Sequence, residues 1–361
     1  MGRMGEASAH RDRLPAMNQQ HLAGFLFFFL ALASPAAGPA PFVDLGKIPE
    51  GVLFGAYMDF GETEDHVTLE GIEKFERMAG KSPAIIASSS YWGQQSFPAK
   101  NIALISRHGA VPLVFWSPWD KPYEQQKGPD RFSLTEILAG KWDAYIDSWA
   151  DSAKAFGKPF FVSFCNEMNG SWFPWSGYFY GGEKGGNEVF RRAWRYVVDR
   201  VRARGAQNIL WVFHANAFPG INDEWNMMAS YYPGADYVDW LGLSIYGKQF
   251  RGDGNWADFR DLIDWPYQEI TALDPDKPVM IAEFGVADFP ESGDKAKWIR
   301  DAFQMIPDRP RIKAAVFWHE RWENADGSFS NLRINSSPSA LEAFRSAVSS
   351  PLWIPSKREE K

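Results

Sequence analysis

Phe160-Phe161-Val162-Ser163-Phe164-Cys165-Asn166-Glu167 is the stretch of this 361-residue sequence that decides the fold. Its first residues are almost continuously apolar, as in a strand that is covered on both faces. The run ends at Asn166 and Glu167, so we expect a carboxylate at the carboxyl end of a buried strand. Cys165 is the single cysteine of the chain, which excludes an internal disulfide, and we expect it to be a small buried filler.

Similar apolar runs recur along the chain and alternate with amphipathic segments. The expected strands cover residues 52–57, 84–88, 111–116, 160–164, 209–213, 241–246, 279–282 and 314–318. Apolar residues spaced by three and four predict helices over residues 142–156, 190–201 and 299–306. Further markers of helix ends are a capping box at Ser133–Glu136 and the glycines Gly80, Gly109, Gly157 and Gly205. Strands that alternate with helices in this way predict an α/β fold, a single-domain (β/α)8 TIM barrel.

A doubly wound open sheet is the main alternative fold. Such a sheet often carries a glycine-rich phosphate loop after its first strand, where this chain has Tyr57-Met58-Asp59-Phe60. We therefore favour one barrel that fills residues 51–350. An N-terminal extension of residues 38–50 would precede it, and a charged C-terminal tail of residues 351–361 would follow it.

The N-terminus resembles a secretory signal and is left out of the fold. Three arginines precede the apolar stretch Leu22–Ala33, which is followed by small residues. Residues 1–37 are thus expected to be a signal peptide, and the mature protein to be exported to the periplasm or the cell exterior. An uncleaved anchor and a start at Met17 are the alternatives, although the apolar stretch is short for a bilayer span.

Composition restricts the kinds of partner that the protein can have. Hydrophobic residues make up 45% of the chain, enough for a sizeable core, and the formal net charge is −7. Because no basic block lies outside the termini, nucleic acid and anionic membranes are disfavoured as main partners. The 17 Trp residues and the aromatic share of 16% suit a cleft for a polysaccharide or oligosaccharide, because sugar faces stack on aromatic rings.

A second carboxylate ends another apolar run. Glu283 follows Val279-Met280-Ile281-Ala282, much as Glu167 follows its own strand. The carboxyl ends of all strands of a barrel meet at one rim, where active sites lie, so the two acids are expected on the same face. A lone Glu there would more simply be a helix cap or half of an ion pair. A pair of acids in apolar surroundings is what hydrolysis of a glycosidic bond requires.

Polar and aromatic side chains follow other expected strands and complete a candidate site. We expect substrate contacts from Asn166, Tyr246, Trp318, Trp116, Trp175, His214 and Asn216. Core packing is the competing interpretation for the tryptophans, and a satisfied structural histidine is the competing interpretation for His214. No paired-His or calcium-loop motif accompanies His319, Glu320 and Glu323, so neither a metal nor a cofactor is expected.

Two motifs carry a resemblance to a known family. The segment Asn166–Trp175 resembles the acid/base motif of glycoside hydrolase family 26, and Ala282-Glu283-Phe284-Gly285 is similar to its nucleophile motif. The resemblance implies a retaining (β/α)8 enzyme, because members of the family share this fold and mechanism. They are chiefly endo-β-mannanases, with some β-glucanases and β-xylanases. For such an enzyme the two carboxyl groups are expected about 5 to 5.5 Å apart, which leads to retention of the anomeric configuration.

The resemblance also implies roles for single residues. Glu167 would be the general acid/base and Glu283 the nucleophile. Trp172 would form an aromatic wall, Tyr246 would donate a hydrogen bond to the nucleophile, and Trp318 would be the platform beneath the reactive sugar.

Asn166 departs from the family pattern, which usually has His immediately before the acid/base Glu. Asn-Glu at this place resembles the wider clan of retaining barrel glycosidases, where the Asn hydrogen-bonds the 2-hydroxyl of the substrate. Because mannose and glucose differ in the orientation of that hydroxyl, both β-mannan and β-glucan are candidate substrates.

Two functions of other kinds are the alternatives to an endo-acting glycoside hydrolase. A non-catalytic glycan-binding protein would keep the barrel and the aromatic residues, but the presence of both acids disfavours it. A metal-dependent polysaccharide deacetylase would need His and Asp ligands, and the chain has no recognisable pattern of them.

Overall fold

The computed structural model describes residues 50–61, 65–121 and 128–356. The predicted signal peptide, most of the predicted N-terminal extension and the charged residues from Lys357 onward lie outside the described residues. Within the described ranges, no helix has the length and apolar character needed to cross a membrane.

Parallel strands close into a barrel, as the alternating pattern predicts. They are β1 (Val52–Met58), β2 (Ile85–Tyr91), β3 (Val111–Ser117), β4 (Phe160–Phe164), β5 (Ile209–Asn216), β6 (Trp240–Tyr246), β7 (Val279–Gly285) and β8 (Ile312–His319). Each strand pairs with the next, and β8 pairs in parallel with β1, so the ring has no open edge between them. The (β/α)8 barrel is therefore confirmed, and the doubly wound sheet is excluded.

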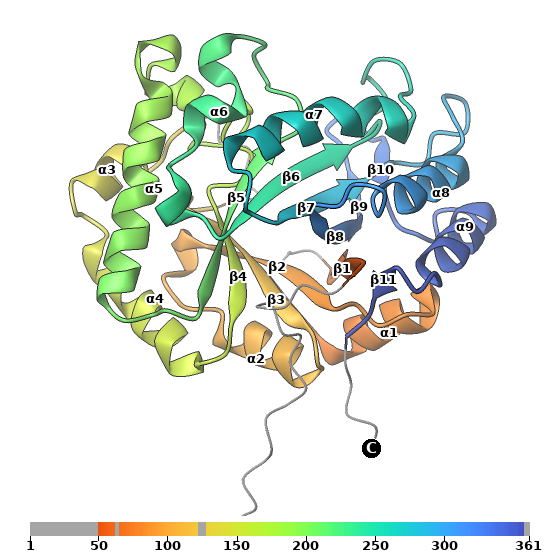
Figure 1. The fold of residues 1–361 in the computed structure, drawn as a ribbon, viewed down its shortest axis with the longest axis horizontal. Coiled ribbons are helices and arrows are strands. Elements are labelled where there is room, and N and C mark those ends of the chain that lie inside the picture. The colour runs from red at the N-terminus through yellow and green to blue at the C-terminus, as the bar shows by residue number, and fades with distance from the viewer. Residues whose placement is uncertain (1–49, 62–64, 122–127, 357–361) are drawn as a thin grey trace, which may run out of the picture. The chain divides into compact units, whose positions relative to one another are not determined.

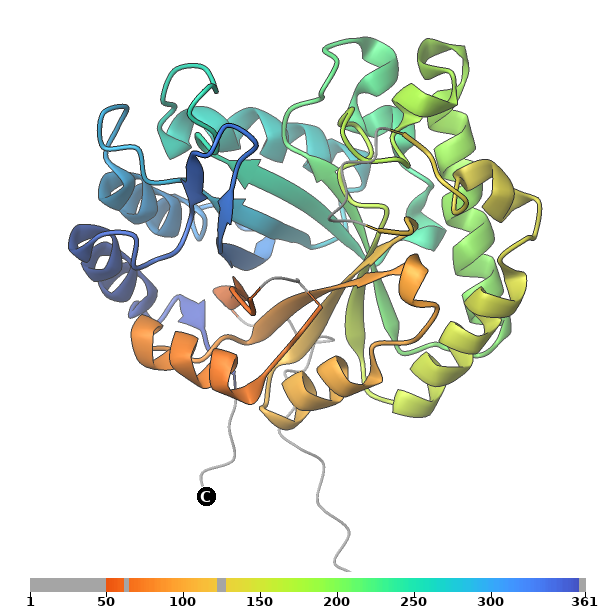
Figure 2. The same cartoon turned by 180° about the vertical axis from the view of Figure 1, so that it is seen from behind.

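Helices surround the ring of strands (Figures 1 and 2). They are α1 (Leu69–Ala79), α2 (Ala99–Arg107), α3 (Leu134–Leu138), α4 (Asp143–Phe156), α5 (Gly186–Ala203), α6 (Met228–Tyr231), α7 (Phe259–Leu273), α8 (Lys295–Met305) and α9 (Pro338–Val348). The three helices predicted from apolar spacing are confirmed as α4, α5 and α8. Gly80 ends α1 at a φ of 76°, and its N–H donates to the Glu76 carbonyl at 2.8 Å, as expected for a left-handed helix cap.

The capping box predicted before α3 is half formed. The Ser133 hydroxyl accepts the N–H of Glu136 at 3.3 Å. The N–H of Ser133 donates instead to the Asp130 carbonyl, and the Glu136 carboxylate pairs with Lys141 at 2.7 Å. The helix start is thus capped by the serine alone.

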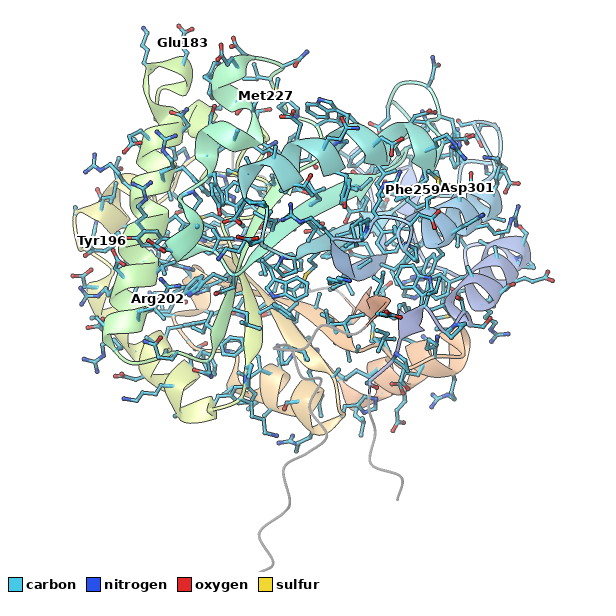
Figure 3. All side chains as sticks on the ribbon, viewed as in Figure 1. Glu183, Tyr196, Arg202, Met227, Phe259 and Asp301 are labelled. Atoms are coloured by element: carbon cyan, nitrogen blue, oxygen red, sulfur yellow. The ribbon has the colours of Figure 1, made fainter. Side chains whose placement is uncertain are left out.

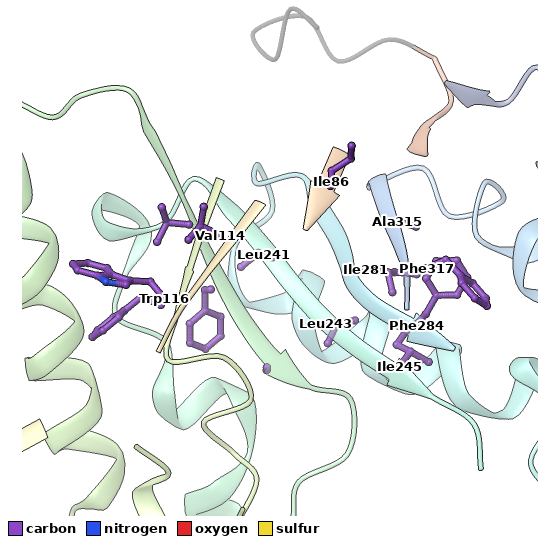
Figure 4. Packing of buried hydrophobic residues seen from close by; sticks show 14 of the residues in the cluster. Ile86, Val114, Trp116, Leu241, Leu243, Ile245, Ile281, Phe284, Ala315 and Phe317 are labelled. Carbon is purple, nitrogen blue, oxygen red and sulfur yellow. The ribbon is translucent and has the colours of Figure 1, made fainter. Parts of the chain in front are cut away.

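Alternate residues of each strand face two different cores. Side chains such as Ile86, Val114 and Trp116 point outward and pack under the helices (Figure 4). The residues between them fill the inside of the barrel; Phe115, Val212 and Met280 are examples. The inward set of each strand therefore determines which side chains can reach the mouth of the barrel.

The barrel includes a short strand near its C-terminus, β11 (Trp353–Ile354), which pairs in parallel with β1. Trp353 is only 1% exposed and packs on Phe303 at a ring distance of 4.5 Å. Residues 351–356 therefore belong to the barrel and not to the tail predicted for residues 351–361, because the buried tryptophan anchors them. A second addition is the hairpin of β9 (Arg321–Glu323) and β10 (Phe329–Asn331), which follows β8.

Candidate active site

The backbone turns sharply where β4 ends. Cys165 and Glu167 both have a φ of 54°, in the left-handed region that residues other than glycine seldom adopt. The peptide bond between Asn166 and Glu167 is held at both of its polar groups: the N–H of Glu167 donates to the His214 carbonyl at 2.7 Å, and the Trp175 indole donates to the Asn166 carbonyl at 2.7 Å. Strained positions of this kind cost about 1 kcal/mol or more each, and they cluster at functional sites.

A β-bulge in β7 brings Glu283 to the interior of the barrel. In the pairing of β6 with β7, Leu243 lies opposite Ile281 but the next residue, Ser244, lies opposite Glu283, so Ala282 is skipped. Ala282 faces inward, so in a regular strand without this bulge Glu283 would point outward among the helices. The bulge re-aims its carboxylate toward the mouth of the barrel.

Ser244 links the two carboxylates. Its hydroxyl hydrogen-bonds the side chain of Glu167, and its backbone lies directly opposite Glu283. Glu167 and Glu283 also line the same cavity. The structure thus brings the two acids together at one place on the barrel rim, although they are far apart along the chain.

The surroundings of Glu167 favour its protonated form. Burial raises the pKa of the Glu167 carboxyl, while hydrogen bonds from Ser244 and from the Trp172 indole, at 2.8 Å, lower that pKa in part. Because burial is the largest of these effects, the pKa stays above its ordinary value. A carboxyl group of this kind can act as a general acid.

Glu283 receives a hydrogen bond from Tyr246. The phenol donates to the Glu283 carboxylate at 2.7 Å, and burial together with the charge of Glu283 raises the pKa of Tyr246 well above its ordinary value. The phenol therefore keeps its proton and remains a donor to this carboxylate.

The cavity around the two acids has a volume of about 1190 Å³. Its floor includes Trp318, which stacks on Tyr57 with ring centroids 4.1 Å apart. The Trp318 indole donates to the Glu320 carboxylate at 2.7 Å, which fixes the orientation of the ring. Its walls carry exposed aromatic rings, Trp172 at 45% and Phe250 at 41% exposure, which suits a ligand with flat apolar faces.

Several predicted site residues line this cavity. They are Glu167, Trp172, Asn216, Tyr246, Glu283 and Trp318. The amide of Asn216 donates to the Phe218 carbonyl at 2.6 Å, so this side chain also holds the next part of the rim. Asn166 is 6% exposed and is not among the lining residues, and its contact with a sugar hydroxyl stays a prediction.

Three of the predicted substrate contacts are wrong. Trp116 is fully buried on the outer face of β3, where it stacks on Trp149 at 4.1 Å. Trp175 is 1% exposed and packs beside Phe173. His214 is fully buried inside the barrel below the cavity rim. Trp116 and Trp175 are thus turned away from the opening by their strand and loop, whereas His214 faces the barrel interior but lies too deep to reach a substrate.

Other lining residues have no counterpart among the predictions. They are Ser244, Phe218, Phe250, Glu320, Arg321, Trp322, Glu323, Arg333, Asp59 and Gln249, together with several small residues. Ser244 could have been found from the sequence, because it lies two positions before Tyr246 and therefore on the same face of β6. The others lie on loops and on the β9–β10 hairpin, where no periodic pattern predicts the direction of a side chain.

Cys165 is buried, as expected, and burial raises the pKa of its thiol well above the ordinary range. A thiol with a raised pKa is a poor nucleophile at neutral pH. In the described part of the chain, no three His, Cys, Asp or Glu side chains are grouped in a way that could hold a metal ion.

A sequence profile described as glycosyl hydrolase family 26 matches residues 102–306, a range that contains both Glu167 and Glu283. The chain belongs to glycosyl hydrolase family 26. Endoglucanase H of Acetivibrio thermocellus is 31% identical to it over 327 residues, which cover 90% of this chain and 33% of that protein. Mannan endo-1,4-β-mannosidase of Bacillus subtilis is 23% identical, with 76% of each chain covered.

Solved structures of family 26 proteins share the fold. A β-mannanase from Bacteroides ovatus superposes with a TM-score of 0.60 at 17% identity, covering 85% of this chain and 91% of that chain. The sequence covers only part of its first curated relatives: 33% of endoglucanase H and 50% of a β-1,3-xylanase from a Vibrio species.

Proposed function

We propose that this protein is a retaining, endo-acting glycoside hydrolase that cleaves a β-linked polysaccharide. The observation that carries this proposal is the meeting of Glu167 and Glu283 at Ser244, in one cavity with aromatic walls. Glycosidase chemistry needs two carboxyl groups in different environments. Here burial favours the neutral form of Glu167, whereas Glu283 accepts a hydrogen bond from Tyr246.

The proposed reaction has two steps. Glu283 attacks the anomeric carbon and forms a glycosyl-enzyme ester, while Glu167 gives its proton to the leaving oxygen. Glu167, now ionised, then removes a proton from water, and the resulting attack on the anomeric carbon releases the sugar and restores Glu283. Two inversions at the same carbon give net retention.

The names of the relatives favour a β-glucan over β-mannan as the substrate. Endoglucanase H matches 90% of this chain at 31% identity, whereas the Bacillus subtilis mannosidase matches 76% at 23%. Asn166 agrees with this preference, because the 2-hydroxyl that it is proposed to bind differs in orientation between glucose and mannose. The apolar stretch Leu22–Ala33 supports the further proposal that the protein is exported.

Azide rescue of two variants tests the mechanism. With a 2,4-dinitrophenyl β-cellobioside, Glu167→Ala should be rescued by azide to give the β-glycosyl azide, because azide attacks the glycosyl-enzyme. Glu283→Ala should give the α-glycosyl azide, because azide then takes the place of the nucleophile. The opposite anomers, or no rescue of either variant, would contradict the assigned roles.

The substrate and the competing glycan-binding function are tested with the unmodified protein. It should hydrolyse mixed-linkage β-glucan faster than β-mannan, and NMR should detect the β-anomer as the first product. Binding to these polymers without any release of reducing ends would favour the glycan-binding alternative.

A further inference from the structure

We propose that His214 is a positioning residue for Glu167. It acts through Ser244, in a relay of hydrogen bonds that links Ser163, His214, Ser244 and the Glu167 carboxyl in that order. This inference rests on the proposed function of Glu167. It gives a role to His214, which was predicted to contact substrate but is fully buried in the structure.

The relay crosses three neighbouring strands inside the barrel. Ser163 of β4 lies 3.0 Å from Nδ1 of His214 on β5, and Nε2 of His214 lies 2.7 Å from Oγ of Ser244 on β6. All three side chains are fully buried. Ser244 then hydrogen-bonds Glu167, so the relay ends at the candidate acid/base.

The direction of each hydrogen bond follows from the donors and acceptors. An ionised Glu167 carboxylate can only accept, so the single proton of the Ser244 hydroxyl is donated to it. Ser244 must then accept from Nε2–H of His214. The Nδ1 atom of this tautomer carries no proton and accepts from the Ser163 hydroxyl. Burial lowers the pKa of His214 to about 3, so the ring stays neutral and the direction is kept at neutral pH.

A fixed direction matters because Glu167 changes its charge in each half of the reaction. Glu167 ionises when it protonates the leaving group, and the aligned Ser244 proton stabilises that charge. The other groups around it are Glu283 of β7, Tyr246 of β6, the Trp172 indole and, next to Tyr246, Glu320 after β8. Without His214, the Ser244 hydroxyl could rotate away from this carboxylate.

The pH dependence of kcat/KM tests the relay. The basic limb of this profile reports the protonated acid/base, so Ser244→Ala should move that limb to higher pH by about half a unit or more, since a hydrogen bond that lowers the pKa is lost. His214→Ala should give a smaller shift in the same direction. His214→Gln, whose amide can donate to Ser244, should restore much of the wild-type profile.

Two further variants separate positioning from folding. Ser163→Ala removes only the outer hydrogen bond and covers the case in which His214→Ala does not fold. Ser90→Ala is the matched control, because Ser90 is equally buried, but on the outer face of β2 with no side-chain partner, and it should leave the limb unchanged. The relay is overturned if the basic limb stays at the wild-type pH in Ser244→Ala or in a folded His214→Ala. Where His214→Ala does not fold, an unchanged limb in Ser163→Ala overturns it. Loss of the proposed function would instead appear as absence of hydrolysis by the unmodified protein.

A second inference concerns an aromatic pair at the edge of the cavity. Phe218, which lines the cavity after β5, stacks on Trp265 of α7 with ring centroids 5.6 Å apart and an interplanar angle of 14°. Phe218 is 41% and Trp265 38% exposed, unlike most large aromatic side chains of this protein. We propose that the Phe218–Trp265 pair is a distal subsite, on which a sugar of the same β-linked chain stacks beyond the sugars held at the catalytic carboxylates.

Substrates of different length test this subsite. Trp265→Ala should raise KM several-fold on polymer and on long oligosaccharides while leaving the hydrolysis of an aryl cellobioside unchanged. Tyr178→Ala is the matched control, since Tyr178 is 52% exposed and is not among the lining residues. An unchanged KM on polymer, or an equal loss on both substrates, contradicts the proposal. The aryl cellobioside reports independently on whether the proposed glycosidase activity exists.

Discussion

At the scale of single residues, Trp172 has two separable contributions, an aromatic face and an indole N–H that binds Glu167 at 2.8 Å. Trp172→Phe keeps the ring and removes the donor. The pKa of Glu167 should then rise, because a hydrogen bond that lowers it is lost. We expect the basic limb of the kcat/KM profile to move to higher pH and the rate to fall about fivefold at neutral pH, since such a bond contributes about 1 kcal/mol.

A glycine offers an independent way to disturb the same contact. A Cβ at Gly170 would lie 2.5 Å from the Trp172 ring, which is half exposed and therefore free to move. Gly170→Ala should thus displace the indole and shift the pH profile as Trp172→Phe does. An unaltered profile in both variants would mean that the indole does not influence Glu167.

Tyr246→Phe removes the hydrogen bond to Glu283 and leaves the ring in place. Because a bond to a charged group is worth about 1.5 to 3 kcal/mol, kcat/KM should fall about 10- to 100-fold. Initial rates with an aryl cellobioside, together with an unchanged circular dichroism spectrum, check this expectation. A loss of less than twofold would show that the phenol does not support the nucleophile.

The residues of the site were predictable where a periodic pattern fixed their direction. Tyr246 and Trp318 lie at inward-facing positions of their strands and face the opening. The two acids were predictable as strand-end residues, but their direction depends on the turn after β4 and on the bulge in β7. Trp116 also follows an apolar run, but it lies on the outer face of its strand. Counting by twos from the buried residues of β3 would have placed it among the helices.

At the scale of elements, the bulge in β7 is the feature that the sequence does not reveal. Strict alternation predicts an outward Glu283 next to an inward Ala282, and only the skipped pairing with β6 reverses this. The β4–α5 connection is similar: it begins at the left-handed Cys165 and includes the exposed Glu183 (Figure 3). Its length and aromatic residues were visible in the sequence, but not its path.

The short strand β11 should contribute strongly to stability. Trp353 is 1% exposed, and its indole donates to the Phe303 carbonyl at 3.1 Å. Trp353→Ala should lower the free energy of unfolding by about 3 to 5 kcal/mol, the usual cost of removing a buried aromatic ring. Leu352→Ala next to it should change stability by about 0.5 kcal/mol or less, because Leu352 is 51% exposed. Urea unfolding of both variants measures the difference, and equal losses would contradict the anchoring role.

At the scale of the whole molecule, the barrel was predictable because each of its strands is a continuous apolar run between amphipathic helices. The same rule could not find β9, β10 and β11, which are two or three residues long and partly exposed. Of these short elements, β9 lines the cavity, together with the loops that carry Phe250 and Arg333. The fold and the presence of two acids at strand ends therefore follow from sequence patterns, whereas the shape of the cavity does not.

Two buried histidines should make the stability of the whole barrel sensitive to acid. Burial is the main cause that lowers the pKa of both His214 and His319 to about 3. An unfolded histidine has a pKa of about 6.5. Between these values the unfolded chain binds more protons than the folded chain, so stability is lost as pH falls below about 6.5. Each histidine contributes about 1.4 kcal/mol per pH unit in the middle of this window.

His319→Asn isolates one half of this effect. In the folded protein Nδ1 of His319 accepts the N–H of Ile334 at 2.9 Å, and an asparagine oxygen can take over that role without titrating. Urea unfolding between pH 4 and 6 should therefore show a pH slope that is smaller by about 1.4 kcal/mol per unit in the variant. Carboxylates add to the slope in both proteins and cancel in the difference. An identical slope would mean that His319 is protonated within the folded barrel, which its burial beside Arg333 and Lys295 opposes.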